Sequence, residues 1–206
     1  LVTLLKLQLQ HQQQLWARND VGHIRTMSLR HRKDNSMREI ITGNTDGLVQ
    51  AFHAGKKLLW SKQFGSRIID IQTGYIDGNK QEEIMLCSSD RNIYVLSGGG
   101  RREPRTSSFE TRVSSICVAP SQNQHFPQII VGSEEKKLYI LGNDLKALAE
   151  PINTRGSIGI LRAYISHEMQ RLEIIVGSLD DHVYAYTRNG TLLWVHQTHD
   201  HIPVSY

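Results

Sequence analysis

The sequence predicts an all-β protein built from four-stranded repeats, and three observations lead to this fold class. A motif of one Glu or Gln followed by apolar residues recurs at steps of 44, 45 and 45 residues, beginning at Glu39, Glu83, Gln128 and Glu173. A carboxylate follows each start at a constant offset, at Asp46, Asp90, Glu135 and Asp180. The apolar runs are too short for stable helices and are rich in β-branched and aromatic residues. Such a period indicates small units that bury their core only against one another.

Each repeat divides into four strand-like runs. In the third copy we predict strands at 112–118, 128–132, 138–141 and 147–149. The runs are separated by segments rich in Asn, Asp and Gly, such as 44–47 and 188–190, which tolerate the positive φ of tight hairpins. Four short antiparallel strands per repeat make one blade of a β-propeller.

The repeat register extends almost to both ends of the chain. We predict a single β-propeller domain, or part of one, over residues 1–206, with blades at about 22–63, 66–108, 111–154 and 156–198. Residues 1–20 are predicted to supply strands of a partial blade, and residues 199–206 to begin another. Because an open array leaves exposed edges, we expect the chain to be a fragment of a larger propeller.

Several segments carry a family resemblance. Residues 113–121, 129–133 and 138–141 resemble a WD40-type blade. Residues 55–60 and 190–194, which both end in Leu-Leu-Trp, are similar to the blade endings of quinoprotein-like propellers. Residues 75–84 resemble the Asp-rich turn of FG-GAP-type repeats. The resemblance covers nearly the whole chain and implies the β-propeller superfamily, with no single protein identified.

Composition narrows the classes of function. The net charge of +4 comes from dispersed Lys and Arg pairs, whereas nucleic-acid binders concentrate basic charge beside stacking aromatics, so we expect no nucleic-acid ligand. No apolar run is long enough to span a bilayer. The two cysteines, Cys87 and Cys117, are too few for a disulfide framework, which favours a reducing compartment and a cytoplasmic location.

The candidate partner-binding residues are defined by their position in the repeat. The residue before each predicted first strand is polar or cationic: His23, Arg67, Arg112, Ser157 and His201. In a propeller the first strands line the central channel, so His23, Arg67, Arg112 and His201 would form a partly cationic ring suited to an acidic protein or peptide. The alternative is that these residues are only solvated strand ends.

The other candidate sites have weaker support. The histidines at 196, 199 and 201 could bind a transition metal, but they match no ligand spacing, and the turn around Asp77 lacks the carboxylates of a calcium loop. We therefore predict no metal and no cofactor. The glycine run at 98–100 lies in a hairpin rather than before a helix, and local sequence marks out no catalytic triad, so we predict no catalytic residues.

Taken with the repeats, these observations predict a non-catalytic interaction platform in a larger, multi-subunit assembly, with rigid blades presenting loops to a protein or peptide. The alternative is a quinoprotein-like propeller that binds a ligand or cofactor, which could be an enzyme because propeller active sites leave no linear motif. We further predict that Trp60 and Trp194, at equivalent repeat positions, fill the space between blades.

Overall fold

The structure is a computed structural model that describes residues 22–31, 38–53, 57–78, 81–97, 100, 102–120 and 127–198. The strands predicted within residues 1–20 and 199–206 lie outside this range. Within it, the protein is all-β, with four antiparallel four-stranded sheets in sequence order. The predicted β-propeller fold is confirmed.

Each sheet is one blade, and its strands follow the chain from first to fourth. Blade 1 contains β1 (Ile24–His31), β2 (Arg38–Asn44), β3 (Leu48–His53) and β4 (Leu58–Gln63). Blade 2 contains β5 (Ile68–Gly74), β6 (Glu83–Ser88), β7 (Asn92–Leu96) and β8 (Arg105–Ser108). Blade 3 contains β9 (Val113–Ala119), β10 (Gln128–Ser133), β11 (Lys137–Leu141) and β12 (Ile152–Asn153). Blade 4 contains β13 (Ile158–Ser166), β14 (Arg171–Ser178), β15 (His182–Thr187) and β16 (Leu192–Gln197).

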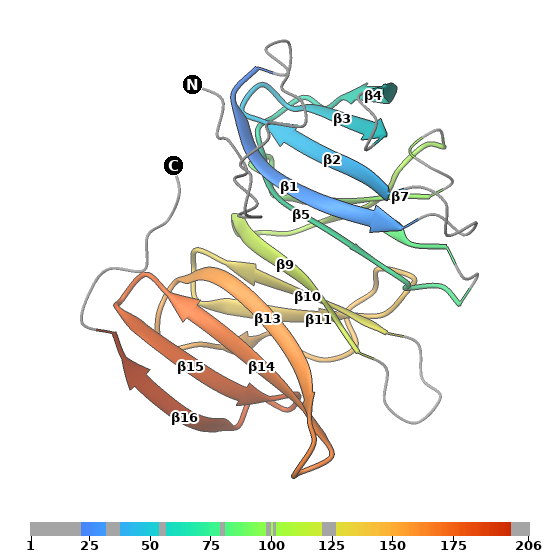
Figure 1. Ribbon diagram of the computed structural model, residues 1–206. Helices are drawn as coiled ribbons and strands as arrows, with labels where there is room; N and C mark the ends of the chain where they lie inside the picture. Colours follow the sequence, from blue (N-terminus) through green and yellow to red (C-terminus); the bar gives the residue numbers. More distant parts are fainter. Residues whose placement is uncertain are drawn as a thin grey trace, which may run out of the picture.

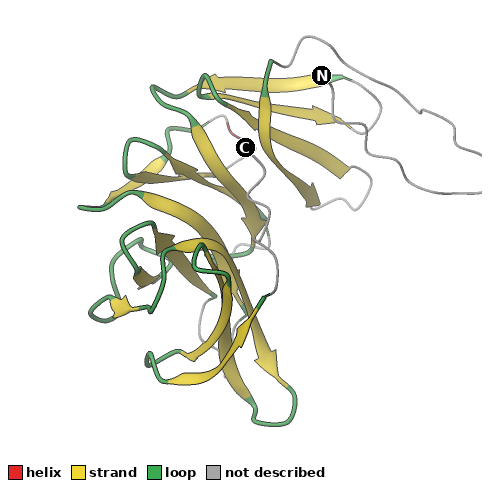
Figure 2. Cartoon of the chain, turned by 90° about the vertical axis from the view of Figure 1, so that its left-hand side faces the viewer, coloured by secondary structure: helices red, strands yellow, loops and turns green. Residues whose placement is uncertain are grey.

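The four blades follow one another along an arc, as the two views in Figure 1 and Figure 2 show. Their first strands contact in series, β1 with β5, β5 with β9, and β9 with β13. Side chains join these inner strands. Asp70 Oδ2 accepts hydrogen bonds from Ser115 Oγ (2.9 Å) and from the Ile116 amide (3.0 Å). Ser115 Oγ in turn accepts one from the Leu161 amide (3.2 Å). The inner strands therefore hold adjacent blades in a fixed relation.

The core lies between blades, which explains why the recurring motif is apolar at consecutive positions. Ile129 and Val131 of β10 pack in the cluster shared with blade 2, whereas Ile130 packs in the cluster shared with blade 4. Successive side chains of a strand point to opposite faces. A strand that is buried on both faces therefore needs an uninterrupted apolar run.

The polar residue that opens the motif is buried in an ion pair in three blades. Glu39 pairs with Arg30, Glu83 with Arg105 and Glu173 with Arg171, each at 3.2 Å. Ser97 Oγ also donates a hydrogen bond to Glu83. Burial raises the pKa of the Glu83 carboxyl, against the opposing effects of Ser97 and Arg105. The charge at the motif start is thus a structural element of the blade.

Glycine in the second strand allows the next blade to pack closely. A Cβ added at Gly132 would lie 2.5 Å from Ile158 Cγ2, and one added at Gly43 would lie 2.7 Å from Ile68 Cγ2. We therefore expect Gly132→Ala to destabilise the protein by about 1 to 3 kcal/mol through overpacking. Urea unfolding measures this loss. Gly65→Ala is the matched control, because an added Cβ meets no atom within 4 Å there. Equal effects of the two changes would contradict the packing argument.

One predicted strand is wrong. Residues 147–149 do not form the fourth strand of blade 3, which is β12 at Ile152–Asn153. Only Ala147 bridges Leu141, because the preceding turn places Leu145 at φ 66°. Pro151, which has no amide hydrogen, then separates this bridge from β12. The apolar run that suggested a strand lies next to the sheet without continuing it.

Candidate functional site

The predicted ring residues occupy one equivalent backbone position in every described blade. The carbonyl oxygens of His23, Arg67, Arg112 and Ser157 accept hydrogen bonds from the amides of Thr45, Ser89, Glu134 and Leu179, at 3.2, 2.9, 3.0 and 3.0 Å. The side chains of His23, Arg67 and Arg112 are exposed. The structure therefore brings these three to the same end of the propeller, while His201 lies outside the described residues. Their role in partner binding stays a prediction.

The same end of the propeller carries four hairpin turns, one between the second and third strands of each blade. Each turn contains one residue whose φ is positive, in the left-handed region. This position is Gly47 in blade 1 (φ 82°), but Arg91 in blade 2 (69°), Lys136 in blade 3 (61°) and Asp181 in blade 4 (63°). Non-glycine residues rarely adopt this conformation, at a cost of about 1 kcal/mol or more each. Three blades therefore keep a charged residue where glycine would be less strained.

We name this surface the turn face, meaning the four turns 44–47, 88–91, 133–136 and 178–181 together with the blade-to-blade connections beside them. A second hydrogen bond, repeated in each blade, joins the turn to the residue that follows the fourth strand. The amides of Phe64, Phe109, Thr154 and Thr198 donate to the carbonyls of Gly47, Arg91, Lys136 and Asp181, at 2.9, 2.9, 2.8 and 2.7 Å. The turn face is thus rigid in backbone while its charged side chains project outward.

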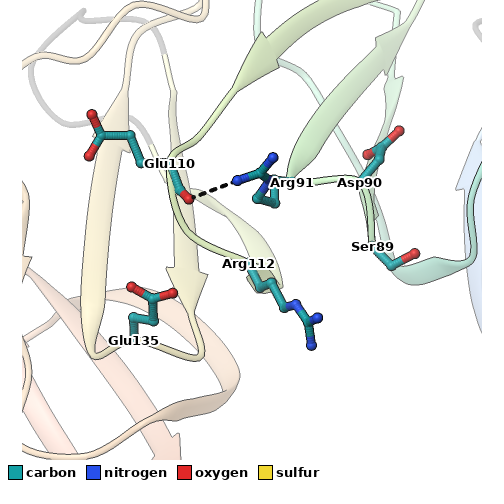
Figure 3. A pocket seen from close by; sticks show the side chains of 6 residues that line it. All are labelled: Ser89, Asp90, Arg91, Glu110, Arg112 and Glu135. Atoms are coloured by element: carbon teal, nitrogen blue, oxygen red, sulfur yellow. Dashed lines mark hydrogen bonds between the residues drawn. The ribbon is translucent and has the colours of Figure 1, made fainter.

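A pocket of about 520 Å³ lies on the turn face between blades 2 and 3, lined by Ser89, Asp90, Arg91, Glu110, Arg112 and Glu135. Figure 3 shows Glu110 and Glu135 on one side, Ser89 and Asp90 on the other, and the two arginines between them. Arg91 Nη1 donates to the Glu110 carbonyl oxygen at 3.4 Å. The lining therefore offers two guanidinium groups and three carboxylates. The pocket lining is of mixed charge, and it includes Arg112 of the predicted ring.

The side-chain carboxylate of Asp90 accepts hydrogen bonds from residues of its own blade. Its Oδ2 accepts a 2.6 Å hydrogen bond from the Tyr94 hydroxyl and its Oδ1 a 3.1 Å bond from the Asn92 amide. Asp180 and Tyr184 repeat the carboxylate–hydroxyl bond in blade 4 at 2.8 Å. Burial opposes ionisation of Asp90, but the bonds from Tyr94 and Asn92 outweigh it and hold the pKa of this carboxyl below its ordinary value of 3.8. In blades 2 and 4 the recurring carboxylate therefore anchors the third strand.

This anchor predicts a pH-dependent stability. Because the folded-state pKa of Asp90 is depressed, its contribution is present above the unfolded pKa of 3.8 and is lost as pH falls through the folded value. We expect Asp90→Asn to cost about 1 kcal/mol at pH 7 and less near pH 3. Urea unfolding at both pH values tests this. A difference between variant and wild type that does not change with pH would contradict it.

Sequence reasoning found Arg112 but missed its pocket neighbours. Glu110 lies in the connection after blade 2, whereas Arg91 and Glu135 lie in turns of different blades. The repeated offset of the carboxylate did predict Asp90 and Glu135 as turn residues. Nothing in the linear pattern places Glu110 beside Arg91.

Of the histidines considered as metal ligands, the structure describes only His196, since His199 and His201 lie outside the described residues. Among the described residues no group of three or more His, Cys, Asp or Glu side chains could hold a metal ion, and His196 is exposed on β16. Cys87 and Cys117 are free and buried. Burial raises the pKa of the Cys117 thiol to about 12 and that of Cys87 well above its ordinary value. No helix in the described part of the chain is long and apolar enough to cross a membrane.

The sheets, their serial first strands and the turn face define a β-propeller. Residues 34–154 match the family described as the lambda-carrageenase beta-propeller domain, and the chain belongs to this family. No curated protein matches the sequence. The earlier resemblance to WD40 and quinoprotein-like blades remains a prediction.

Solved structures confirm the fold. Two crystal structures of BBS1N in complex with ARL6DN, soaked with lead or with mercury, align with TM-scores of 0.69 and 0.68 at 14% identity. Each alignment covers 87% of this chain, but this chain spans only 58% and 55% of the two solved chains. At this identity the likeness concerns the fold alone.

Proposed function

We propose that this propeller is a non-catalytic interaction platform that binds a protein or peptide through the turn face, as part of a multi-subunit assembly. The observation that supports it most is the strained turn position, where Arg91, Lys136 and Asp181 replace the glycine of blade 1. Glycine would adopt this conformation with less strain, and backbone strain is commonly retained at functional sites. The solved BBS1N propeller, crystallised with its protein partner ARL6DN, shows that another propeller of this fold binds a protein.

The charges of the pocket favour a partner that carries both signs. The Arg112 guanidinium is exposed and fits an acidic side chain, whereas Glu110 and Glu135 fit a basic one. A polyanion would meet three carboxylates against two guanidinium groups, which is repulsive overall. The pocket therefore suits a peptide with neighbouring acidic and basic residues better than a uniformly anionic chain.

The state of Asp90 supports a non-catalytic role. Ser89 is the hydroxyl of the pocket lining, and Asp90 is the carboxylate next to it in sequence. Both oxygens of Asp90 already accept hydrogen bonds, and its pKa is depressed. A general base works best with a pKa near the working pH. Asp90 is thus a poor base for Ser89, and we propose that the pocket binds without catalysis.

The test compares charge removal on the two ends of the propeller. Arg67→Ala/Arg112→Ala removes two guanidinium groups from the turn face, and Arg188→Ala removes one from the opposite end of blade 4. All three side chains are exposed, so we expect unfolding free energies within about 0.5 kcal/mol of wild type. Tagged variants are used for affinity capture from native lysate with quantitative mass spectrometry. We expect a stoichiometric partner to fall at least about tenfold with the double variant and to remain with Arg188→Ala, since about 1.4 kcal/mol of lost binding gives this factor.

The substitution Arg91→Gly is expected to weaken partner binding without lowering the stability of the fold. Glycine removes the backbone strain, so the variant should be as stable as wild type or more so, while the pocket loses one guanidinium. Reduced partner binding with undiminished stability supports the proposal. Full binding by both Arg91→Gly and the double variant would overturn it. A copurifying quinone or metal that raises the melting temperature would favour the ligand-binding alternative instead.

We also propose a cytoplasmic location. The support is the presence of two free, buried thiols in different blades, each unreactive because burial raises its pKa. Fractionation of the source cells, with the chain detected by mass spectrometry, tests this.

A further inference from the structure

Blade 4 replaces polar side chains of the repeat with apolar ones at two positions near the turn face. Leu179 directly follows the second strand and is 50% exposed. Its counterparts in blades 1 to 3 are polar: Thr45, Ser89 and Glu134. Ile160 lies in the first strand and is 43% exposed. Its counterparts are also polar: Thr26, Asp70 and Ser115. Two apolar side chains therefore reach solvent where the repeat otherwise has polar ones.

A glycine completes this departure from the repeat. Leu179 lies over the start of β13, because a Cβ added at Gly159 would be 3.2 Å from Leu179 Cδ2. Ile160 is the next residue of the same strand. The counterparts of Gly159 all carry side chains: Arg25, Ile69 and Ser114. We name the surface formed by Gly159, Ile160 and Leu179 the apolar patch. Departures from local consistency that gather at one place are typical of a functional site.

A following blade does not cover the position of Leu179. Thr45 and Glu134 are exposed and Ser89 is half-buried, although a blade follows each of them in the array. Ser115, the counterpart of Ile160, is 1% exposed beside blade 4. Leu179 is therefore the part of the apolar patch that stays open to a partner on the turn face, with or without a further blade.

The charges beside the apolar patch are mostly acidic. The turn that contains Leu179 continues with the carboxylates of Asp180 and Asp181. Arg155 is exposed on the connection before β13, and this connection packs on Asp180, since a Cβ added at the next residue would lie 2.1 Å from Asp180 Oδ2. His182 Nδ1 lies 3.6 Å from Asp180 Oδ1. Two carboxylates against one guanidinium favour a basic residue in whatever binds here.

We propose that the apolar patch binds a large apolar side chain of the partner, and that a Lys or Arg adjoins this side chain in the partner's sequence. The inference rests on the proposed function, because it places the contact on the turn face. Burial of the apolar side chain against Leu179 supplies affinity, whereas the carboxylates of the turn select the basic neighbour. The partner then has an apolar contact at blade 4 beside the charged pocket between blades 2 and 3.

The test uses a phage library of random peptides as the probe, panned on the full-length protein. Enriched peptides are synthesised with a fluorophore, and fluorescence anisotropy measures their affinities for the wild type and the variants. Leu179→Thr introduces the blade 1 residue. Leu148→Thr is the matched control, because Leu148 is a leucine of similar exposure (48%) at the opposite end of blade 3. Both positions are exposed, so both variants should fold, which circular dichroism checks.

We expect the enriched peptides to share a large apolar residue next to Lys or Arg. Leu179→Thr should weaken their binding at least about tenfold, and Leu148→Thr by less than about twofold. Asp181→Gly removes a carboxylate together with the positive-φ strain and should weaken binding about threefold. Salt should reduce the effect of Asp181→Gly and leave that of Leu179→Thr unchanged, because only the first is electrostatic.

The outcomes separate this inference from the proposed function. Peptides that lose affinity for Arg67→Ala/Arg112→Ala but bind Leu179→Thr normally overturn the inference and leave the proposed function standing. Peptides that neither variant affects, or a library that yields no binding peptide, overturn both. Peptides that need Leu179 but share no basic residue contradict the partner chemistry stated here.

Discussion

Arg30→Ala is expected to destabilise the protein by about 3 to 5 kcal/mol, because it removes one partner of a buried ion pair. Arg30 Nη1 lies 3.2 Å from Glu39 Oε2, and both side chains are almost fully buried. Arg30 Nε also donates to the Glu82 carbonyl oxygen of blade 2 at 2.8 Å. The substitution therefore breaks a bond within blade 1 and a bond between blades 1 and 2. Urea unfolding followed by circular dichroism measures the loss.

The double variant Arg30→Met/Glu39→Leu shows how much of the stability lost in Arg30→Ala comes from an unpaired buried charge and how much from lost packing. It removes both charges while keeping similar side-chain volume, and replacement of a buried ion pair by apolar residues is often neutral or stabilising. We expect it to recover most of the stability that Arg30→Ala loses. A double variant as unstable as the single one would show that the bond to Glu82, rather than the ion pair, dominates.

Trp60→Ala is expected to cost about 3 kcal/mol, whereas Trp194→Ala in the 206-residue chain should cost about 1 kcal/mol or less. Trp60 packs in the cluster between blades 1 and 2, and its indole lies so close to Gly100 that a Cβ there would be 2.6 Å from the ring. Trp194 holds the equivalent repeat position, yet it is exposed at the end of the described array. Tryptophan is a large apolar group, so its contribution follows the area that a neighbouring blade covers.

Denaturant unfolding of both variants measures this contrast. The prediction that both tryptophans fill the space between blades is met at Trp60, where blade 2 supplies the covering residues. At Trp194 none of the described residues belongs to a following blade. Equal losses for the two substitutions would mean that the repeat position alone sets the contribution, and would contradict the packing described for Trp60.

The turn face shows how far repeat positions predict a site. The register correctly placed His23, Arg67 and Arg112 at one backbone position, because the hydrogen bond from the following turn recurs in each blade. It also identified the carboxylates Asp90 and Glu135 as turn residues. It could not show that Asp90 anchors Tyr94, which depends on side-chain orientation across the turn. Nor could it show that Glu110 and Arg91 meet, because their proximity depends on the path of a connection between blades.

The repeat, the four-stranded blades and the all-β fold could all be predicted from the order of the residues. The apolar runs and turn residues repeat in register. Each of these signals is local: short apolar runs rich in β-branched residues, bounded by residues that permit tight turns. The sequence did not locate the fourth strand of blade 3, because Leu145 and Pro151 interrupt an apolar run in ways that only backbone geometry reveals. The packing of the blades shows which charged residues are buried in ion pairs, which charged residues line the pocket and which apolar side chains stay exposed. Burial depends on the neighbouring blade, and equivalent residues such as Trp60 and Trp194 therefore have different environments.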